Sequence, residues 1–127
     1  MAITYGALTA KPQLTEGTHS LRLIQANHTR NNGRIELLFG SLEFDGLASE
    51  SVMPEQTNWV LPIWESKLGI TIDPNIEYET EEQMRDGIVE TLQQAIGEYF
   101  DMEVVDSNLP PKNGKKLMNA TFASPYR

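Results

Sequence analysis

The sequence predicts a mainly β fold, a small five-stranded barrel with one helix between the third and fourth strands. Three observations lead to this prediction. Apolar residues alternate along several short segments, tight-turn pairs such as Asn32-Gly33 and Asp45-Gly46 separate these segments, and one amphipathic stretch follows the third of them. The length of 127 residues suits a single domain with its own hydrophobic core.

The first three strands are expected in the first half of the chain. Leu21 and Leu23 share one face of the first strand, and the second strand alternates as far as Phe39. After Gly40 the apolar positions change parity, which predicts a β-bulge at this glycine and therefore a strongly bent strand. Residues 47–54 are predicted to form the third strand.

One amphipathic helix is predicted over residues 80–96. Thr80 and Gln83 have the spacing of a capping box, acidic residues crowd the first turn, and apolar residues from Met84 to Leu92 recur at helical spacing. These features place the helix after the third strand and before the next alternating segment.

Two further strands are predicted at residues 99–106 and 117–123, and the resulting order of elements is the connectivity of the OB fold. An open α+β sheet with the helix on one face has the same order, but the bend expected at Gly40 favours the barrel. Residues 1–16 lack a period and are expected to form an arm outside a single domain of residues 17–127. Pro62 is expected to leave the segment before the helix irregular or short-helical.

The net charge of −8 is unevenly distributed along the chain. Residues 73–106 contain eleven acidic residues and one basic residue, a charge of −10, whereas the rest of the chain carries +2. An acidic segment repels polyanions, but the basic parts of the chain remain available to them. The absence of cysteine excludes disulfides and thiolate metal sites, and the N-terminal residues lack the features of a signal peptide, so a cytoplasmic location is expected.

The sequence contains no constellation that predicts catalysis. The only histidines, His19 and His28, lie at a strand start and in a turn cluster, and no phosphate-binding glycine loop or nucleophile elbow occurs. The acidic run from Glu79 to Glu82 has the character of a solvated helix start. We therefore predict no enzyme activity, no cofactor and no metal site.

Two basic loops predict a nucleic-acid surface. In an OB barrel the first and last hairpin loops flank a groove across the second and third strands, where oligonucleotides bind. Basic side chains there would contact phosphates, and exposed aromatic rings would stack on bases. The candidate phosphate contacts are Arg22, His28, Arg30, Arg34, Lys112, Lys115 and Lys116. The candidate rings are Phe39, Phe44, Trp59 and Tyr99, of which Phe44 and Trp59 are assigned to the site, although strand aromatics belong more often to the core.

Several short patterns carry a resemblance to a known family. They are Gly17 opening a strand, the return NNGRIELLF, Trp59 followed by Leu68-Gly69-Ile70, and the turn Asn113-Gly114-Lys115. Over residues 17–123 the chain resembles phage-encoded single-stranded DNA-binding proteins with OB folds, of the type found in phages of Gram-positive bacteria. The resemblance implies sequence-tolerant binding of single-stranded DNA, often as a homo-oligomer, in phage DNA replication or recombination in the host cytoplasm.

The chain departs from this resemblance in one respect, and two rival functions are also compatible with the sequence. Many bacterial-type single-strand binders end in an acidic tail that recruits replication enzymes, whereas this chain ends NATFASPYR. The acidic helix could instead contact replication or recombination proteins. The rivals are an acidic protein-interaction module, such as a phage inhibitor or adaptor, and a virion structural protein, neither of which would bind DNA.

Overall fold

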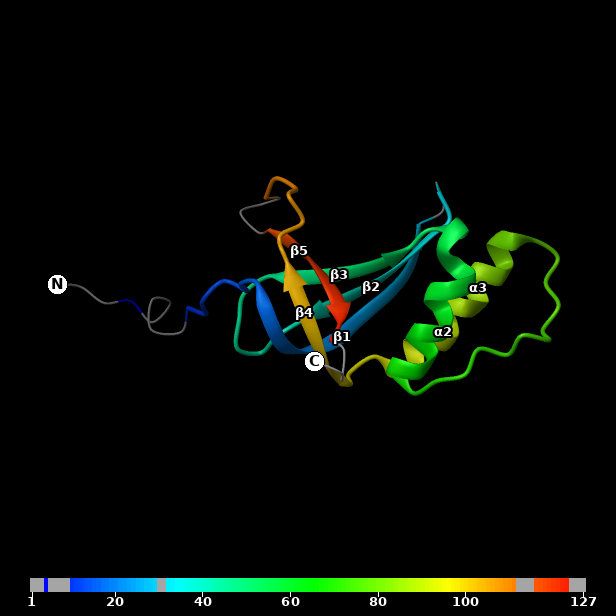
Figure 1. Cartoon of the computed structure of the whole chain (residues 1–127), viewed down its shortest axis with the longest axis horizontal. Coiled ribbons are helices and arrows are strands. Elements are labelled where there is room, and N and C mark those ends of the chain that lie inside the picture. Colours follow the sequence, from blue (N-terminus) through cyan, green and yellow to red (C-terminus); the bar gives the residue numbers. More distant parts are fainter. Residues whose placement is uncertain (1–3, 5–9, 30–31, 112–115, 124–127) are drawn as a thin grey trace.

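Five strands form a closed barrel, and two helices cover one end of it (Figure 1). The computed structural model describes residues 4, 10–29, 32–111 and 116–123. The strands are β1 (Gly17–Thr29), β2 (Arg34–Gly40), β3 (Leu47–Val52), β4 (Tyr99–Val105) and β5 (Leu117–Phe122). Between β3 and β4 lie the 3₁₀ helix η1 (Pro54–Gln56), α2 (Thr57–Leu68), α3 (Glu81–Leu92) and the 3₁₀ helix η2 (Gln93–Ala95). The predicted OB-type barrel is confirmed, but it carries two α-helices where the sequence predicted one.

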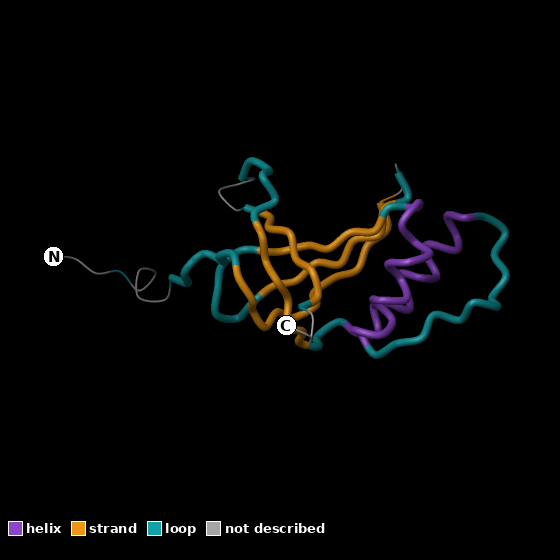
Figure 2. Tube along the Cα trace, viewed as in Figure 1, coloured by secondary structure: helices purple, strands orange, loops and turns teal. Residues whose placement is uncertain are grey.

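The long strand β1 holds the barrel together because it pairs along both of its edges. Residues 17–22 pair antiparallel with β4, and residues 22–29 pair antiparallel with β2. The barrel closes through a parallel pairing of β3 with β5, in which Leu47 lies opposite Leu117. The strands in Figure 2 accordingly wrap into one continuous surface.

The β-bulge that bends the barrel lies in β1. The prediction of a bulge at Gly40 is therefore wrong. The register between β1 and β2 shifts between Leu23 and Gln25, so Ile24 is the extra residue. Gly40 instead ends β2 directly beside this bulge, where an added Cβ would lie 2.5 Å from the Cδ1 atom of Ile24. The glycine is therefore explained by a close contact with the bulged residue on the neighbouring strand.

Inward-facing residues of all five strands and of both helices build a single core. The ring of Phe39 is fully buried and meets Phe100 and Phe122 edge to face, with centroid distances of 6.4 and 6.0 Å. Phe39 is therefore a core residue and not a base-stacking ring. The fully buried larger side chains are Leu21, Leu23, Ile35, Leu37, Phe39, Val52, Trp64, Leu92, Met102 and Val104.

Of the two states expected for this segment, irregular or short-helical, the second is observed, because α2 is a helix of 12 residues that continues through Pro62 and ends at a Gly69 cap. One side of α2 buries Val60, Leu61, Trp64 and Leu68 against the barrel. Pro62 lies on the opposite, exposed side, where water can solvate the carbonyl that lacks its usual N–H partner. Burial of four apolar side chains outweighs the one missing backbone hydrogen bond. Within the described residues, none of the helices has the length and apolar character needed to cross a membrane.

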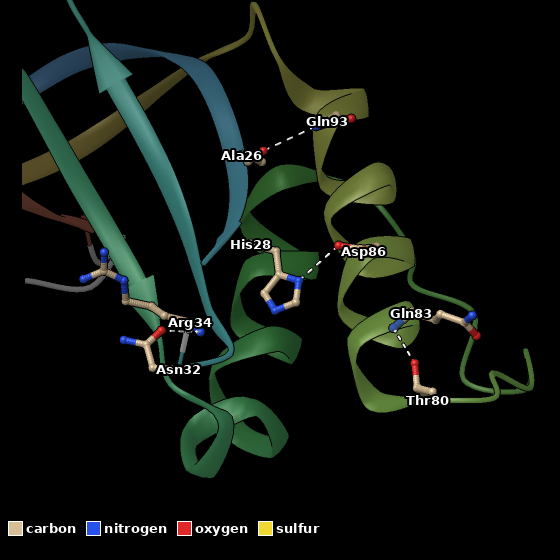
Figure 3. Close-up of polar contacts among 8 residues, drawn as sticks. All are labelled: Ala26, His28, Asn32, Arg34, Thr80, Gln83, Asp86 and Gln93. Carbon is tan, nitrogen blue, oxygen red and sulfur yellow. Dashed lines mark hydrogen bonds and ion pairs between the residues drawn. The ribbon is translucent and has the colours of Figure 1, made fainter. Parts of the chain in front are cut away.

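The helix α3 begins as predicted at a Thr80 cap, whose hydroxyl accepts a hydrogen bond from Gln83 N at 3.1 Å (Figure 3). It ends at Leu92, earlier than predicted, and the chain continues as η2. Gly87 in the middle of α3 makes room for the segment that connects the helices. An added Cβ at Gly87 would lie 2.6 Å from the hydroxyl of Tyr78.

A carboxyl group faces the barrel interior at the helical end. Glu50 pairs with the fully buried Leu37, so the Glu50 side chain starts on the inner face of β3. Burial raises the pKa of Glu50 to about 7, and the neighbouring Trp64 indole offsets this only in part. Among the described residues, neither Glu50 Oε2 nor Trp64 Nε1 has a partner with full hydrogen-bond geometry.

Leu92→Ala should destabilise the protein by about 2 to 5 kcal/mol, because it leaves a cavity where α3 packs on the barrel. Leu92 is 0 % exposed. Urea denaturation measures the loss. The control Ile76→Ala, at a side chain that is 52 % exposed, should stay within about 0.5 kcal/mol of wild type. Equal losses for both variants would contradict the assigned packing of α3.

Glu50→Gln should stabilise the protein above pH 7 and have little effect near pH 4. Because the pKa of Glu50 is raised in the folded state, the folded wild type is most stable while Glu50 is protonated. Its free energy of unfolding falls as pH rises from about 4.5 to about 7. The loss amounts to at most about 3 kcal/mol, at about 1.4 kcal/mol per pKa unit. Urea denaturation at both pH values tests this, with exposed Glu90→Gln as control. A Glu50→Gln effect independent of pH would show that Glu50 is not the titrating group.

Candidate nucleic-acid interface

Most described basic side chains already have polar partners inside the molecule. Arg34 pairs with Glu36 at 3.6 Å, and Lys116 Nζ lies 2.6 Å from Asp106 Oδ1. Lys116 and the backbone N–H of Asn108 lower the pKa of Asp106. At the helical end, Arg85 pairs with Glu81 at 3.1 Å and Lys67 donates to the Ala123 carbonyl at 3.3 Å.

Lys11 and Arg22 are the exceptions. Within residues 4, 10–29, 32–111 and 116–123, no ion pair or hydrogen bond engages either side chain. Both side chains line the same pocket, which has a volume of about 240 Å³ and is called here the Arg22 pocket. The pocket is lined by Lys11, Arg22, Ile24, Gly40, Ser41, Leu42, Phe44, Asp45, Gly46 and Leu47. Two cations without internal partners therefore face one hollow that contains a single carboxylate.

A second hollow adjoins the Arg22 pocket and shares Ser41, Leu42 and Phe44 with it. This Tyr99 pocket has a volume of about 470 Å³ and is lined by Thr18, His19, Ser20, Ser41, Leu42, Glu43, Phe44 and Tyr99. Tyr99 is 49 % exposed and lies opposite Arg22 in the pairing of β1 with β4. The two pockets thus combine cations with exposed aromatic and aliphatic surface.

Local hydrogen bonds hold the loop of residues 41–46, which both pockets share. The Ser41 hydroxyl accepts from the backbone N–H groups of Glu43 and Phe44, at 2.9 and 3.3 Å. The ring of Phe44 meets His19 edge to face at 5.1 Å, and His19 Nε2 lies 2.8 Å from the Thr15 carbonyl. These contacts orient Phe44 at the junction of the two pockets.

Backbone hydrogen bonds hold the described part of the N-terminal arm against this loop. Leu14 N donates to the Asp45 carbonyl and Asp45 N donates to the Pro12 carbonyl, both at 2.8 Å, and Leu14 is buried. Lys11 owes its position at the Arg22 pocket to this pairing. The arm is therefore part of the site, a role that sequence periodicity alone did not indicate. In Figure 1 the arm and the loop lie at the barrel end away from the helices.

The structure places the predicted site residues in different environments. Arg22 and Phe44 both line the Arg22 pocket. The candidate ring Tyr99 lines the adjoining Tyr99 pocket. Arg34 pairs with Glu36, and Trp59 lies on α2 at the other end of the molecule. Arg30, Lys112 and Lys115 lie outside the described residues, so their assignment to phosphates stays a prediction.

His28 is not on the surface where the sequence placed it. Its side chain is 4 % exposed, and Nδ1 lies 3.0 Å from Asp86 Oδ1 on α3 (Figure 3). Close by, the Gln93 side chain donates to the Ala26 carbonyl at 3.3 Å. His28 thus joins β1 to the helices and is buried too deeply to contact a phosphate. Its distant partner Asp86 is 58 positions away in sequence, which explains why local patterns did not reveal the contact.

Asn32 and Gly33, the part of the first hairpin loop that the structure describes, lie beside acidic residues. An added Cβ at Gly33 would lie 3.0 Å from Pro54 and 3.1 Å from Arg85, and Glu81 and Glu82 line the same hollow. The outer face of β2 and β3 carries Arg34, Glu36 and Leu38 on β2 and Leu47, Ser49 and Ser51 on β3, all of which the structure describes. This face contains no aromatic ring, whereas the two pockets at the arm contain several.

No protein-family model and no curated protein sequence matches the chain. Among the residues that the structure describes, no group of three His, Asp or Glu side chains is arranged to hold a metal ion. The barrel and the side chains gathered at its two ends are therefore the features that bear on function.

Proposed function

We propose that the protein binds single-stranded DNA, with little dependence on base sequence, at the Arg22 and Tyr99 pockets. The observation that carries this proposal is the position of Lys11 and Arg22, the two described cations without an internal partner, beside exposed aromatic surface on an OB-type barrel. Cations that track a phosphate backbone, next to rings that stack on bases, are the common features of sequence-tolerant single-strand binding.

The apolar surface around the pockets supports a single strand over a duplex. Four of the exposed large apolar side chains line these two pockets: Ile24, Leu42, Leu47 and Tyr99. Unpaired bases present their flat faces to such surface, whereas a duplex presents mainly phosphates. Lys11 and Arg22 would attract the phosphates, so we expect binding that weakens as salt rises, whereas Asp45 and Glu43, which also line the pockets, limit the attraction.

The biological setting belongs to the same proposal. A role in phage DNA replication or recombination, in the host cytoplasm and as a homo-oligomer, is supported by the resemblance to phage single-strand binders. The second candidate is an acidic interaction module without DNA binding, which the charge of the helical segment favours. Failure of the wild-type protein to bind oligo-dT at micromolar concentration in low salt would favour this second candidate.

Replacing Lys11 and Arg22 together by alanine should weaken oligo-dT binding and make it less salt-dependent. Each phosphate contact contributes about −0.7 to the slope of log K against log salt, so the slope should become shallower by about 1.4. Fluorescence anisotropy across a salt series measures this. The matched control is the double variant Lys67→Ala with Arg85→Ala, which removes the same charge at the helical end. An equal loss in the control would show that only net charge matters.

Tyr99→Ala should cost about 1 to 3 kcal/mol of oligo-dT binding without changing the salt slope, because a stacking contact involves no counterion release. Trp59→Ala, at the other end of the molecule, should leave the affinity unchanged. Anisotropy measures both affinities, and thermal melting checks that both variants fold. The reverse order of effects would place the base contacts on α2 and not on β4.

A further inference from the structure

The helix α2 is apolar on both of its sides. One side is buried against the barrel through Val60, Leu61, Trp64 and Leu68. The opposite side presents Trp59 and Ile63, which are 57 and 47 % exposed, together with exposed Pro62. Trp59, Pro62 and Ile63 form the α2 stripe, whose spacing of three and four residues places them next to each other on the helix surface. Neither the core nor the proposed DNA site uses this stripe.

The segment that carries the stripe is strongly acidic. Residues 53–96 contain nine acidic and two basic residues, a formal charge of −7, whereas the rest of the chain carries −1. Both basic residues have partners within the molecule, Arg85 with Glu81 and Lys67 with the Ala123 carbonyl. Exposed carboxylates, including Glu55, Glu77 and Glu90, therefore outnumber the cations of the segment that carries the stripe, and the field of this segment is negative.

We propose that the α2 stripe docks a basic amphipathic helix of another protein. The apolar side of that helix would cover Trp59 and Ile63, and its Lys and Arg residues would face the surrounding carboxylates. Exposed tryptophan is among the residues that contribute most to protein interfaces, and complementary charge speeds and orients association. A helix is the matching shape because its own apolar stripe repeats at the same spacing.

The charge of this surface selects this occupant over two others. A second copy of the chain would bring an equally acidic helical segment against the first, and the like charges would repel. A nucleic acid is a polyanion and would be repelled in the same way. A groove beside the start of α2 has the same mixed character, since apolar Pro54, Met84 and Ile88 line it together with Glu55, Glu81 and the Arg85 that pairs with Glu81.

The two tryptophans allow the docking to be observed directly. Trp59 is exposed and Trp64 is 0 % exposed, so a change in intrinsic fluorescence on binding reports the stripe. The probe is a synthetic peptide of Leu and Lys patterned as an amphipathic helix. Its controls are a peptide of the same composition with a scrambled pattern and a Leu–Glu peptide with the helical pattern. Calorimetry measures the affinities with the full chain.

The Leu–Lys helix should bind, shift the Trp59 emission to shorter wavelength, and bind more weakly as salt rises. Ile63→Asp and Trp59→Ala should each weaken binding by about tenfold or more. Leu109→Asp, the matched change at an apolar side chain that is 53 % exposed and lies outside the stripe and outside both DNA pockets, should not. Thermal melting confirms that each variant is folded.

Four outcomes would overturn the proposal. They are no binding of the Leu–Lys helix, equal binding of the scrambled or acidic peptide, full affinity in both stripe variants, and self-association that Ile63→Asp abolishes. The last outcome, detected by sedimentation, would assign the stripe to a second copy of the chain. Oligo-dT binding is measured separately, so failure of this proposal leaves the DNA proposal unaffected.

Discussion

The bend of β1 at Ile24 is the constraint on which the barrel depends. The first half of β1 pairs with β4 and the second half with β2, and the bulge that bends the strand lies at the junction of the two halves. The extra residue projects outward over the end of β2, where its Cδ1 atom would lie only 2.5 Å from a Cβ added at Gly40. The same bulge puts Ile24 into the wall of the Arg22 pocket. Barrel closure and the shape of the candidate site thus follow from one irregularity.

The two ends of the barrel have different chemistry because they are covered differently. At one end, α2 and α3 close the core with Trp64 and Leu92, and their segment carries most of the negative charge. At the other end, a short loop and the arm cover the barrel only in part, so Arg22 and its apolar neighbours stay accessible. The acidic surface is thus separated from Lys11 and Arg22, which have no internal partner among the described residues, and the proposed site for a polyanion depends on this separation.

Sequence patterns correctly predicted the structural features that depend on residues close together in the chain. Alternation placed the five strands, and the Thr80 cap placed the start of α3, because both depend on neighbouring residues. Features that depend on partners distant in sequence were left open or predicted wrongly. Pro62 is tolerated because the barrel buries the other side of α2, and His28 is buried because Asp86 packs on it. The site was predicted in part for the same reason, since Lys11 reaches Arg22 only through the pairing of the arm with the loop.

The most direct test of the account is a map of where a single strand contacts the chain. Nuclear magnetic resonance of the ¹⁵N-labelled protein, titrated with oligo-dT at low salt, reports this contact amide by amide. If the strand binds at the Arg22 and Tyr99 pockets, shift changes are expected in residues 18–24 and 40–47 and at Tyr99, with the amides of α2 and α3 unchanged. Changes concentrated on α2 and α3, or on the outer face of β2 and β3 with none at Arg22, would contradict this proposal.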